Sequence, residues 1–566
     1  MKKLICLVLC LVMALSVLAG CGGPATGVET DATESKMGKK APEGYTLKIG
    51  LPTNMLVSDY ETNTLTKWLE EESGYNLDFV KYNSSAADYT AQIATEFMVP
   101  DVKMPDILIG VSLGQQAAMS YGENGLIVNL APYFNDSNYS KVWWDRLNEI
   151  EDKDFVDFAT RKLYVEGKDT IYIFPTVERN TYDMIRHQAF INQEWLDKLN
   201  LPMPTNTEEL YNTLVAFKNQ DPNGNNKKDE IPLIGRATDG YGDLMSWIIN
   251  MFCYYEDARP WRIDENGKLS GFFWDDNYRK ALIFMNKLVK EGLMPDSIFT
   301  MSSDDLSSLV MPFNGVETVG VWLGHPTIVL TDGCEAVDVY KALPQWGNAI
   351  MSVPVFSWDG AVITTDCEYP DAAWEILMLL CTEEGAYRMR YGEKGVDWIE
   401  ATPGSKSFAG LDAHINVLRH DAYGGETTST WNFVKATVGL ANENERTELS
   451  DNLTDWNKGK LTMMGDTYKA NWDAYNAQGG RPKDVVMPLI YTAEEENEVS
   501  VYRNNTTNWF KTNRANFIKG VGEFNDPSNN AQWQAYVDGF KAANYYDWLQ
   551  VAQDIYEYTY GDKTGK

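Results

Sequence analysis

Oxygen-bearing side chains that could bind a metal ion are concentrated in one loop of ten residues, Asp221-Pro-Asn-Gly-Asn-Asn-Lys-Lys-Asp-Glu230. Calcium prefers roughly six to eight hard oxygen ligands, and an EF-hand loop supplies them at alternate positions because alternate residues of a tight turn point inward. The candidate donors here are Asp221, Asn223, Asn225, the main-chain carbonyl of Lys227, Asp229 and Glu230. Their spacing predicts one bound Ca²⁺ ion with a structural role.

The loop departs from the EF-hand pattern at two positions. Asn226 stands where an EF-hand has glycine, although asparagine tolerates a left-handed backbone better than most residues. Pro232 stands where an EF-hand has its bidentate glutamate, so Glu230 would have to complete the coordination. The alternative interpretation is a solvated polar turn, which Asp, Asn, Gly and Pro also favour.

A helix is predicted to lead directly into this loop. Thr205-Asn-Thr-Glu208 fits a capping box at the start of the helix, and Leu210, Leu214 and Phe217 recur at helical spacing. A short apolar run, Ile231-Pro-Leu-Ile234, follows the loop. The loop is therefore expected to be held between two elements of secondary structure.

Three stretches around the loop carry a resemblance to a known family: INQEWLDKLNLP at residues 191–202, DPNGN at 221–225 and KKDEIPL at 227–233. They resemble the family 1 extracellular solute-binding lipoproteins of bacterial ABC sugar importers. Among these, they look closest to the large calcium-containing type related to alginate-oligosaccharide-binding proteins. The resemblance implies an oligosaccharide ligand, ABC transporter permease subunits as partners, a monomer, and no chemistry performed on the ligand.

The amino terminus has the pattern of a lipoprotein signal peptide. Met1-Lys-Lys precedes the apolar run Leu4–Leu18, and Leu18-Ala-Gly-Cys21 resembles a lipobox. Residues 1–20 are expected to be removed, and acyl chains such as palmitate on Cys21 would anchor the protein at the extracytoplasmic face of the cell membrane of a Gram-positive bacterium. Residues 21–44 are small and polar, as in a flexible tether. The alternative is an ordinary secretion signal in which Cys21 is incidental.

The formal net charge is −32, and removal of Lys2 and Lys3 with the signal gives −32 − 2 = −34. Such a surface repels nucleic acid and anionic lipid headgroups, so no nucleic-acid partner and no membrane contact beyond the anchor are expected. The cysteines that remain after the signal and the anchor are Cys253, Cys334, Cys367 and Cys381. Their spacing fits no metal motif and leaves both disulfides and buried thiols open.

Strand and helix patterns alternate at the start of the mature chain. Residues 45–49, 77–82 and 105–110 have strand patterns, and residues 65–74 and 87–98 between them have helical spacing. This order predicts an α/β fold, with parallel strands in a sheet flanked by helices. The chain is too long for one core, so at least two lobes are expected. The resemblance adds the type, a two-lobe periplasmic-binding-protein-like (type II) fold with a helical C-terminal part.

The predicted domain division follows the crossings of the resembled family. Residues 45–165 and 335–398 are assigned to lobe 1. Residues 166–334 and 399–566 are assigned to lobe 2, which then contains the calcium loop. The ligand would bridge the two lobes, and hinge closure around it would be the mechanism of capture.

Aromatic side chains are the expected sugar contacts, because their faces suit the apolar faces of pyranose rings. The chain has 18 Trp and 31 Tyr, most of which must belong to the core. The candidates are Trp322, Trp358, Trp398, Trp247 and Tyr172, with Asp359 as a hydroxyl acceptor and with Ser112 and Gln115, which follow the third predicted strand. The abundance of aromatic over basic residues predicts a neutral oligosaccharide.

The sequence leaves other functions open. An acidic, aromatic-rich chain could also be a glycoside hydrolase, which needs two carboxylates across a cleft. The chain has no His-Glu-x-x-His motif and no phosphate-binding glycine loop with its lysine. A peptide or another small solute is the alternative ligand, because a fold does not determine its ligand. An adhesive surface lipoprotein is a third class. The prediction is a binding protein, not an enzyme.

Overall fold

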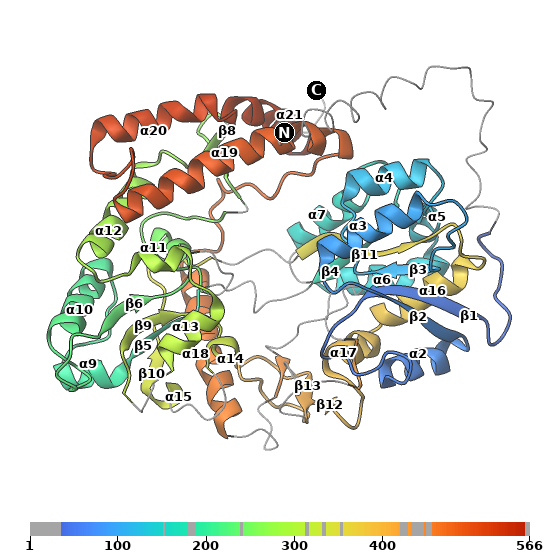
Figure 1. Ribbon diagram of the computed structural model, residues 1–566, viewed down its shortest axis with the longest axis horizontal. Helices are drawn as coiled ribbons and strands as arrows, with labels where there is room; N and C mark the ends of the chain where they lie inside the picture. Colours follow the sequence, from blue (N-terminus) through green and yellow to red (C-terminus); the bar gives the residue numbers. More distant parts are fainter. Residues whose placement is uncertain are drawn as a thin grey trace, which may run out of the picture.

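Two lobes lie side by side, each built around one β-sheet with helices packed on it (Figure 1). The structure, a computed structural model, describes residues 36–150, 153–178, 187–237, 242–257, 259–311, 316–330, 336–350, 355–418, 428–431, 446–448 and 455–560. The predicted α/β class and the helical C-terminal part are confirmed. The predicted signal peptide, Cys21, most of the tether and Cys334 lie outside the described residues.

The sheet of the first lobe has the strand order β2-β1-β3-β11-β4. Its strands are β1 (Thr46–Pro52), β2 (Asn76–Tyr82), β3 (Ile107–Ile109), β4 (Phe174–Glu178) and β11 (Val355–Ile363). Strand β1 runs parallel to β2 and β3, whereas β11 runs antiparallel to β3 and β4. The predicted parallel start of this lobe is therefore confirmed.

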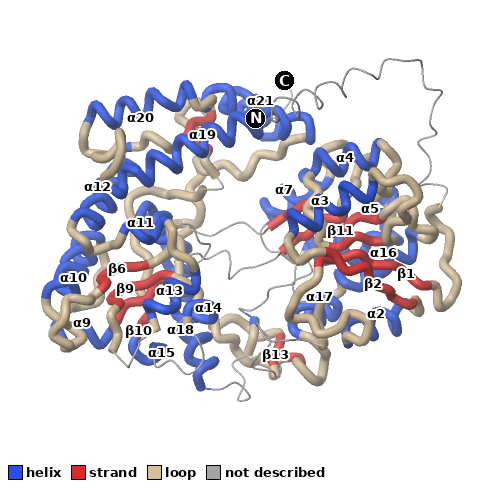
Figure 2. Tube along the Cα trace, in the orientation of Figure 1, coloured by secondary structure: helices blue, strands red, loops and turns tan. Residues whose placement is uncertain are grey.

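Helices cover both faces of this sheet (Figures 1 and 2). Ile107 and Ile109 belong to one hydrophobic core and Leu108 to another, because successive residues of a strand face opposite sides of the sheet. The helices of this lobe are α2 (Thr64–Ser73), α3 (Ala86–Phe97), α4 (Gln115–Glu123), α5 (Ala131–Asn135), α6 (Ser137–Asn148), α7 (Lys153–Leu163), α16 (Pro370–Cys381) and α17 (Glu383–Tyr391).

The sheet of the second lobe has the strand order β10-β5-β9-β6. Its strands are β5 (Ala189–Asn192), β6 (Ile231–Ile234), β9 (Val319–Leu323) and β10 (Tyr340–Ala342). Strands β6 and β9 are parallel, and the other pairs are antiparallel. Two short antiparallel ribbons lie outside the main sheets, β7 (Trp261–Ile263) with β8 (Leu269–Gly271) and β12 (Trp398–Glu400) with β13 (Ile415–Val417).

Long C-terminal helices extend the second lobe (Figure 1). Helix α19 starts at a capping box between Thr492 and Glu495 and ends at the left-handed Gly520. It shares one core with α12, α20 and α21. The helices of this lobe are α9 (Gln193–Leu199), α10 (Thr207–Asn219), α11 (Leu244–Asn250), α12 (Asp276–Lys290), the 3₁₀ helix η1 (Asp296–Phe299), α13 (Ser303–Val310), α14 (Pro326–Val329), α15 (Ala336–Val339), α18 (Asp455–Ala477), α19 (Ala493–Lys519), α20 (Asn530–Ala542) and α21 (Tyr545–Tyr560).

The structure corrects the predicted domain boundaries in three places. Strand β4 lies in the range 166–334 assigned to lobe 2, yet it pairs with β11 in the first sheet. Strand β10 lies in the range 335–398 assigned to lobe 1, yet it pairs with β5 in the second sheet. Trp431, from the range given to lobe 2, packs in the first core, where its Nε1 donates to Thr66 Oγ1 at 2.8 Å. Pairing with distant segments decides these memberships, and the rest of the division stays a prediction.

Two further findings concern possible membrane-spanning helices and the cysteine side chains of the described residues. None of the described helices is both long and apolar enough to span a bilayer. Cys253, Cys367 and Cys381 are not joined to one another by disulfides in the described chain. Burial raises the pKa values of Cys253 and Cys367, so both thiols stay protonated and unreactive at neutral pH.

Candidate ligand cleft and calcium loop

Helix α10 leads into the metal loop. Its N-cap is Asn206, whose Oδ1 accepts hydrogen bonds from the backbone N–H groups of Glu208 and Glu209 at 3.1 and 3.0 Å. The predicted capping box is therefore wrong by one residue, because Glu209 and not Glu208 bonds back to the N–H and hydroxyl of Thr205, both at 2.9 Å. The predicted apolar face is confirmed by the burial of Leu210, Leu214 and Phe217.

Hydrogen bonds inside the loop curl it around its own side-chain oxygens. The two carboxylate oxygens of Asp221 accept from the N–H groups of Asn225 and Asn226 at 3.1 and 3.0 Å. Asn223 Oδ1 accepts from the N–H of Asn225 at 3.0 Å, and Asn225 Oδ1 accepts from the N–H of Lys227 at 2.7 Å. Asn226 has a φ of 60°, so asparagine does adopt the left-handed backbone at the position of the EF-hand glycine.

Three carboxylates lie close together at the end of this loop. The amides of Asn225 and Asn223 donate to Asp229 at 3.0 and 3.3 Å, and these bonds lower the pKa of Asp229. Burial, and then the charges of Asp221 and Asp229, raise the pKa of Glu230. Within the described structure, the buried Oε1 of Glu230 has no hydrogen-bond partner. A buried carboxylate oxygen beside two other carboxylates calls for a cation.

The donor chemistry of the loop fits calcium, since carboxylate, amide and carbonyl oxygens are the ligands of hard cations. Among the described residues, no group of three or more His, Cys, Asp or Glu side chains is placed to hold a metal ion, so amide and carbonyl oxygens would have to supply part of the shell. Both sides of the loop are anchored. Lys198 Nζ donates to the Pro222 carbonyl at 2.5 Å, and Asn223 Nδ2 donates to the Glu317 carbonyl at 3.3 Å, just before β9.

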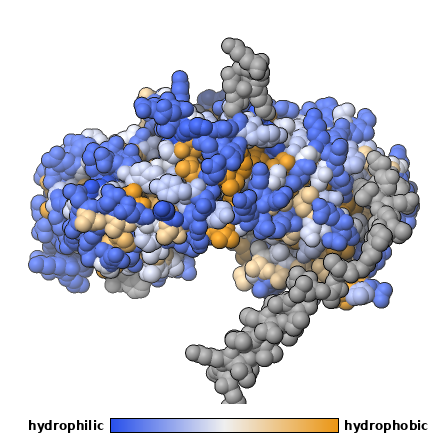
Figure 3. Space-filling model, turned by 90° about the horizontal axis from the view of Figure 1, so that it is seen from above, coloured by the Kyte–Doolittle hydropathy of each residue, from blue (hydrophilic) through white to orange (hydrophobic). Residues whose placement is uncertain are grey.

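A cavity of 520 Å³ lies between the two lobes. The first lobe contributes Gly114, Gln115, Lys162 and Trp358. The other wall consists of residues 257–261, the segment 486–491 that leads into α19, and side chains of α19 and α21. Seen from above, apolar side chains gather in the middle of the molecule, between the lobes (Figure 3). The volume falls within the range of about 300–1,000 Å³ that ligand pockets occupy.

Trp358 reaches this cavity through an irregularity in β11. The register of β11 against β4 shifts between Ser357 and Ala361, so the strand bulges at the tryptophan. A Cβ atom on Gly360 would lie 2.2 Å from the carbonyl oxygen of Phe174, which leaves room only for glycine. Bulges change the direction of a side chain and are frequent beside binding sites. The predicted candidate Trp358 thus lines the cavity.

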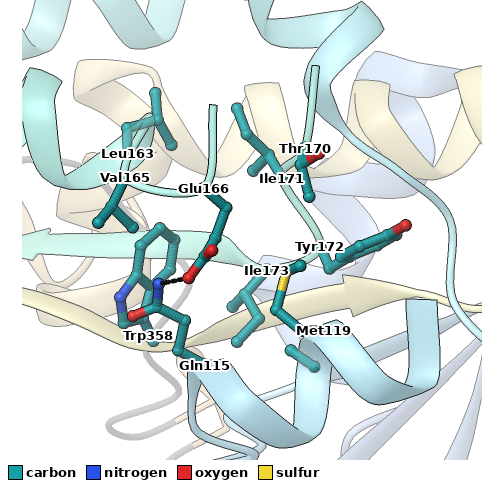
Figure 4. A pocket seen from close by; sticks show the side chains of 11 residues that line it. Gln115, Met119, Leu163, Val165, Glu166, Thr170, Ile171, Tyr172, Ile173 and Trp358 are labelled. Atoms are coloured by element: carbon teal, nitrogen blue, oxygen red, sulfur yellow. Dashed lines mark hydrogen bonds between the residues drawn. The ribbon is translucent and has the colours of Figure 1, made fainter. Parts of the chain in front are cut away.

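Gln115, Glu166 and Trp358 lie together beside a smaller cavity of 20 Å³ in the first lobe (Figure 4). Gln115 Nε2 donates to the carboxylate of Glu166. The same carboxylate accepts from the N–H of Ala493, the first residue of α19, at 2.5 Å. The Nε1 of Trp358 is buried and has no partner within the described chain. Glu166 therefore links the two lobes next to the indole ring.

Lys162 brings a positive charge to the cavity from the end of α7. Its ammonium donates to the carbonyl of Phe356 at 3.1 Å and lies 5.7 and 5.2 Å from the ring centroids of Phe158 and Phe356. Burial lowers the pKa of Lys162 to about 8, although the carboxylates of Glu496 and Asp359 act in the opposite direction. Asp359 thus lies near the cavity, but as a neighbour of this cation.

The opposite wall carries two arginines, each with an acidic partner. Arg503 Nη1 bonds to Glu496 at 3.2 Å, and both side chains line the cavity. Arg259 Nη1 lies 2.9 Å from Glu256, and the Arg259 side chain is 1% exposed. The Nε and Nη2 atoms of Arg259 are buried without a hydrogen-bond partner in the described structure, and burial lowers the pKa of this guanidinium.

Four aromatic candidates lie away from the large cavity. Trp247 and Trp322 are 0% exposed in the cores of the second lobe. Trp398, at 2% exposed, packs under the β12–β13 ribbon and donates to the Gly392 carbonyl at 2.9 Å. Tyr172 lines the smaller cavity. In this conformation the three tryptophan rings offer a ligand no surface, so their burial disfavours the predicted sugar contacts.

The pentapeptide Gly110-Val-Ser-Leu-Gly114 matches the Gly-x-Ser-x-Gly pattern of hydrolase nucleophile elbows. It lies between β3 and α4, which is the strand–turn–helix context of that pattern. The candidate Ser112 is exposed, and its hydroxyl has no hydrogen-bond partner among the described residues. A nucleophilic serine needs a base within hydrogen-bond reach, so the described structure supplies the motif without its catalytic partner.

Several cavity residues were missed by the sequence argument: Lys162, Arg259, Trp261 and Trp548. Each belongs to a helix, a strand or a loop end whose local pattern is ordinary. Trp261 and Trp548 pack against each other with ring centroids 4.7 Å apart, although 287 residues separate them (548 − 261). No local signal marks such residues, because only the folding of distant segments against one another makes them neighbours.

No family model matches the chain. A fructooligosaccharide ABC transporter substrate-binding protein of Streptococcus pneumoniae, FusA, is 27% identical over 339 residues, which are 59% of this chain and 60% of that relative. The lipoprotein LipO of Bacillus subtilis is 29% identical over 166 residues, which are 29% of this chain and 30% of that relative. The chain thus matches less than two thirds of the length of these curated relatives.

Solved structures are similar over nearly the whole chain. A structure of S. pneumoniae FusA, an EF-hand mutant in complex with fructo-nystose, has a TM-score of 0.65 at 18% identity and covers 92% of this chain and 100% of that one. A human-milk-oligosaccharide-binding, ABC-transporter-associated solute-binding protein from Bifidobacterium longum infantis has a TM-score of 0.67 at 19% identity, covering 91% and 99%. The predicted resemblance is thereby confirmed: the chain has the two-lobe fold of the solute-binding proteins of ABC transporters.

Proposed function

We propose that this protein is an extracytoplasmic solute-binding protein that captures an oligosaccharide between its lobes and delivers it to the permease subunits of an ABC transporter. The observation that carries this proposal is the 520 Å³ cavity, which Trp358 and Gln115 line from one lobe and Trp261 and Trp548 from the other. Its aromatic groups suit sugar rings, and its polar groups can bond to hydroxyls. The name of the pneumococcal relative, a fructooligosaccharide-binding protein, supports the sugar class.

Capture would proceed by hinge closure without covalent chemistry. A ligand that contacts both walls binds the closed arrangement more tightly than the open one and shifts the population toward it. Two polar contacts already join the lobes beside the cavity, Glu166 with the Ala493 N–H and Arg161 Nη1 with the Thr559 carbonyl at 2.9 Å. The ligand would add its own contacts to these, and delivery would require the permease to favour the open arrangement.

The proposed place of action is the outer face of the cell membrane. The support is Leu18-Ala-Gly-Cys21, together with the similarity to a protein named as a lipoprotein. Acyl chains on Cys21 would hold the protein there, and the small polar residues that follow would let it reach the permease. Metabolic labelling with palmitate is expected to mark the native protein and to spare Cys21→Ser. Equal labelling of both would contradict the anchor.

The loop 221–230 is proposed to hold one calcium ion through Asp221, Asn223, Asn225, the Lys227 carbonyl, Asp229 and Glu230. When bound, the ion would supply a positive charge beside the buried Oε1 of Glu230 and would fasten the end of α10 to β6. A FusA structure that is described as an EF-hand mutant supports such a loop in this fold. No described residue of the loop lines the cavity, so the ion is expected to stabilise the lobe and not to touch the ligand.

The proposed function is tested by thermal-shift and calorimetric titration with a panel of oligosaccharides. A ligand at 100 times its dissociation constant is expected to add about 2.7 kcal/mol to the free energy of unfolding. Trp358→Ala is expected to weaken binding by about 1–3 kcal/mol if the indole stacks on a sugar ring. Trp322→Phe, a change in a buried core ring, is the matched control and should leave affinity unchanged. Failure of every oligosaccharide to bind would contradict the proposal.

A further inference from the structure

The first described residues of the chain, 36–44, lie against the first lobe, although the composition predicts a flexible tether as far as residue 44. The ammonium of Lys36 donates to the carbonyl oxygens of Thr365 and Cys367 at 2.8 and 2.9 Å. Both carbonyls belong to the turn that joins β11 to α16. One cation near the start of the described chain thus binds two acceptors that lie 329 and 331 residues further along the sequence.

Asp371, in the first turn of α16, binds the backbone of the same segment. Its Oδ2 accepts hydrogen bonds from the N–H of Gly38 and from the hydroxyl of Tyr139, both at 3.0 Å. Its Oδ1 accepts from the hydroxyl of the buried Tyr133 at 2.8 Å. The two tyrosines belong to α5 and α6, so the lobe itself orients the carboxylate that receives the Gly38 N–H. Hydrogen bonds to a charged acceptor are stronger than those between neutral groups.

Apolar contacts and an ion pair complete the attachment of this segment. Three of its side chains pack against the hydrophobic core of the first lobe: Met37, Ala41 and Tyr45. Lys39 Nζ lies 3.1 Å from the Glu368 carboxylate and 4.3 Å from the centroid of the Tyr369 ring. Exposed ion pairs stabilise a protein only slightly, so the apolar contacts and the hydrogen bonds at Lys36 and Gly38 are the main attachments.

We propose that residues 36–44 form a strap that docks on the first lobe, and that only residues 21–35 serve as the free tether. Holding a segment in one conformation costs backbone entropy, which the contacts with Asp371, the β11–α16 turn and the core offset. The free chain then has 35 − 20 = 15 residues, instead of the 44 − 20 = 24 that the composition predicts. At about 3.3–3.6 Å per extended residue, its greatest span falls from about 80 Å to about 50 Å.

The strap also determines where the chain leaves the folded protein. The described chain begins at the outer end of the first lobe, on the side away from the second lobe (Figure 1). Without the strap the tether would leave the lobe at β1, whereas with it the chain leaves beside the N-terminus of α16. A shorter tether that starts at a fixed point limits where the protein can meet the permease. This consequence rests on the proposed lipid anchor at Cys21, but the docking of the strap does not.

Trypsin tests the strap directly, because it cleaves after Lys and Arg. Residues 21–35 contain neither, so the first sites beyond Cys21 are Lys36, Lys39 and Lys40, all within the strap. Cleavage requires local release of the segment, so its rate follows the population of the released form. In the purified native protein, cleavage after Lys39 is expected to be about tenfold or more slower than in a synthetic peptide of residues 30–50, as measured by mass spectrometry.

Two variants show whether the observed contacts hold the strap. Lys36→Met removes both bonds to the β11–α16 turn and should speed cleavage after Lys39 about fivefold or more, relative to the matching peptide. Lys40→Met is the control, because the exposed Lys40 side chain makes no hydrogen bond or ion pair within the described residues. A glutamate-specific protease should cut after Glu34, which precedes the strap, equally fast in all three proteins. Unchanged melting temperatures would show that the lobe itself stays folded.

Hydrogen exchange provides a second measurement. The amide of Gly38, which donates to Asp371, should exchange about tenfold or more slowly than in the peptide. Lys36→Met should remove most of this protection, and Lys40→Met should keep it.

Each outcome separates the strap from the proposed function. Cleavage after Lys39 as fast in the native protein as in the peptide would overturn the strap, and so would equal rates in the native protein and Lys36→Met. Absence of palmitate from Cys21 would overturn the shortened membrane tether, while the protection of residues 36–44 would stand. Failure of every oligosaccharide to bind would contradict the proposed function and leave the strap intact.

Discussion

The calcium loop and the ligand cavity are built in opposite ways. The donors of the loop lie within ten consecutive residues, 221–230. The lining of the cavity comes from residues as far apart as Gly114 and Trp548. The loop needs only its own backbone to orient its oxygens, whereas the cavity exists because two sheets and a pair of C-terminal helices meet. Replacing a single metal-ligating residue is expected to damage the loop site. The cavity is expected to be damaged by any change that moves one of its walls.

The two sites also differ in the charge of their buried groups. The loop gathers carboxylates, and the buried Oε1 of Glu230 has no hydrogen-bond partner in the described structure. The cavity gathers cations, and two nitrogens of Arg259 have none. Burying an unpaired carboxylate oxygen is costly, so the loop indicates a cation, whereas the guanidinium of Arg259 already has Glu256 as its charge partner.

The largest expected effect is the loss of calcium. EDTA, or Asp221→Ala, should lower the free energy of unfolding by about 4 kcal/mol if the ion is present at 1,000 times its dissociation constant. Melting curves measure this loss, and ligand affinity in the folded variant should be unchanged because the loop does not line the cavity. Glu265→Ala, at an exposed acid of another turn, is the control. An unchanged melting curve in EDTA, or no calcium in the purified protein, would show that the loop is a polar turn that binds no calcium.

The next effect tests how the cavity is assembled. Gly360→Ala places a Cβ atom 2.2 Å from the Phe174 carbonyl and should push β11 away from β4, at a cost of about 3 kcal/mol in denaturant titrations. Ligand affinity should fall as well, because Trp358 is carried by the same bulge. Gly125→Ala is the control, since it meets open space at a φ of 71° and should cost about 1–2 kcal/mol. Equal losses of unfolding free energy in the two variants would show that the close approach of Gly360 to the Phe174 carbonyl is unimportant.

A smaller effect concerns the pH dependence of stability at the cavity. Lys162 has a folded-state pKa lowered to about 8 from 10.5, so between these values the unfolded chain binds more protons than the folded one. The free energy of unfolding therefore gains from Lys162 as pH rises through this window, and below it the full cost of burying the charge is present. Lys162→Met should flatten the rise by about 1–2 kcal/mol, after solvent screening on the cavity side. Parallel stability curves of variant and native protein would contradict the burial of this charge.

The smallest effect is expected at the link between the lobes. Glu166→Gln removes the negative charge at the N-terminus of α19, a change worth about 0.5 kcal/mol. The melting temperature should hardly move, but the ligand-free population should shift toward the open arrangement and raise the radius of gyration in small-angle scattering. Glu494→Gln, an exposed acid in the first turn of the same helix, is the control. A radius of gyration equal to that of the native protein would show that this contact does not set the balance between open and closed.

The sequence by itself determined what depends on neighbours along the chain. The donor spacing of 221–230, the apolar face of α10 and the parallel start of the first sheet could all be predicted, because turns, helices and strands repeat over a few residues. The left-handed backbone of Asn226 was predictable for the same reason. Calcium itself stays a proposal, since the donors and not the ion are what the chain encodes locally.

Only the tertiary structure decided which aromatic and charged residues meet a ligand. Trp322 and Trp358 are the same residue type near predicted crossings, yet one is buried between strands and the other lines the cavity. The difference comes from the bulge opposite Phe174, which is a contact between segments far apart in the chain. Lys162 and Arg259 face one cavity for the same reason. Burial and proximity are properties of the assembled fold, so no local pattern could have assigned them.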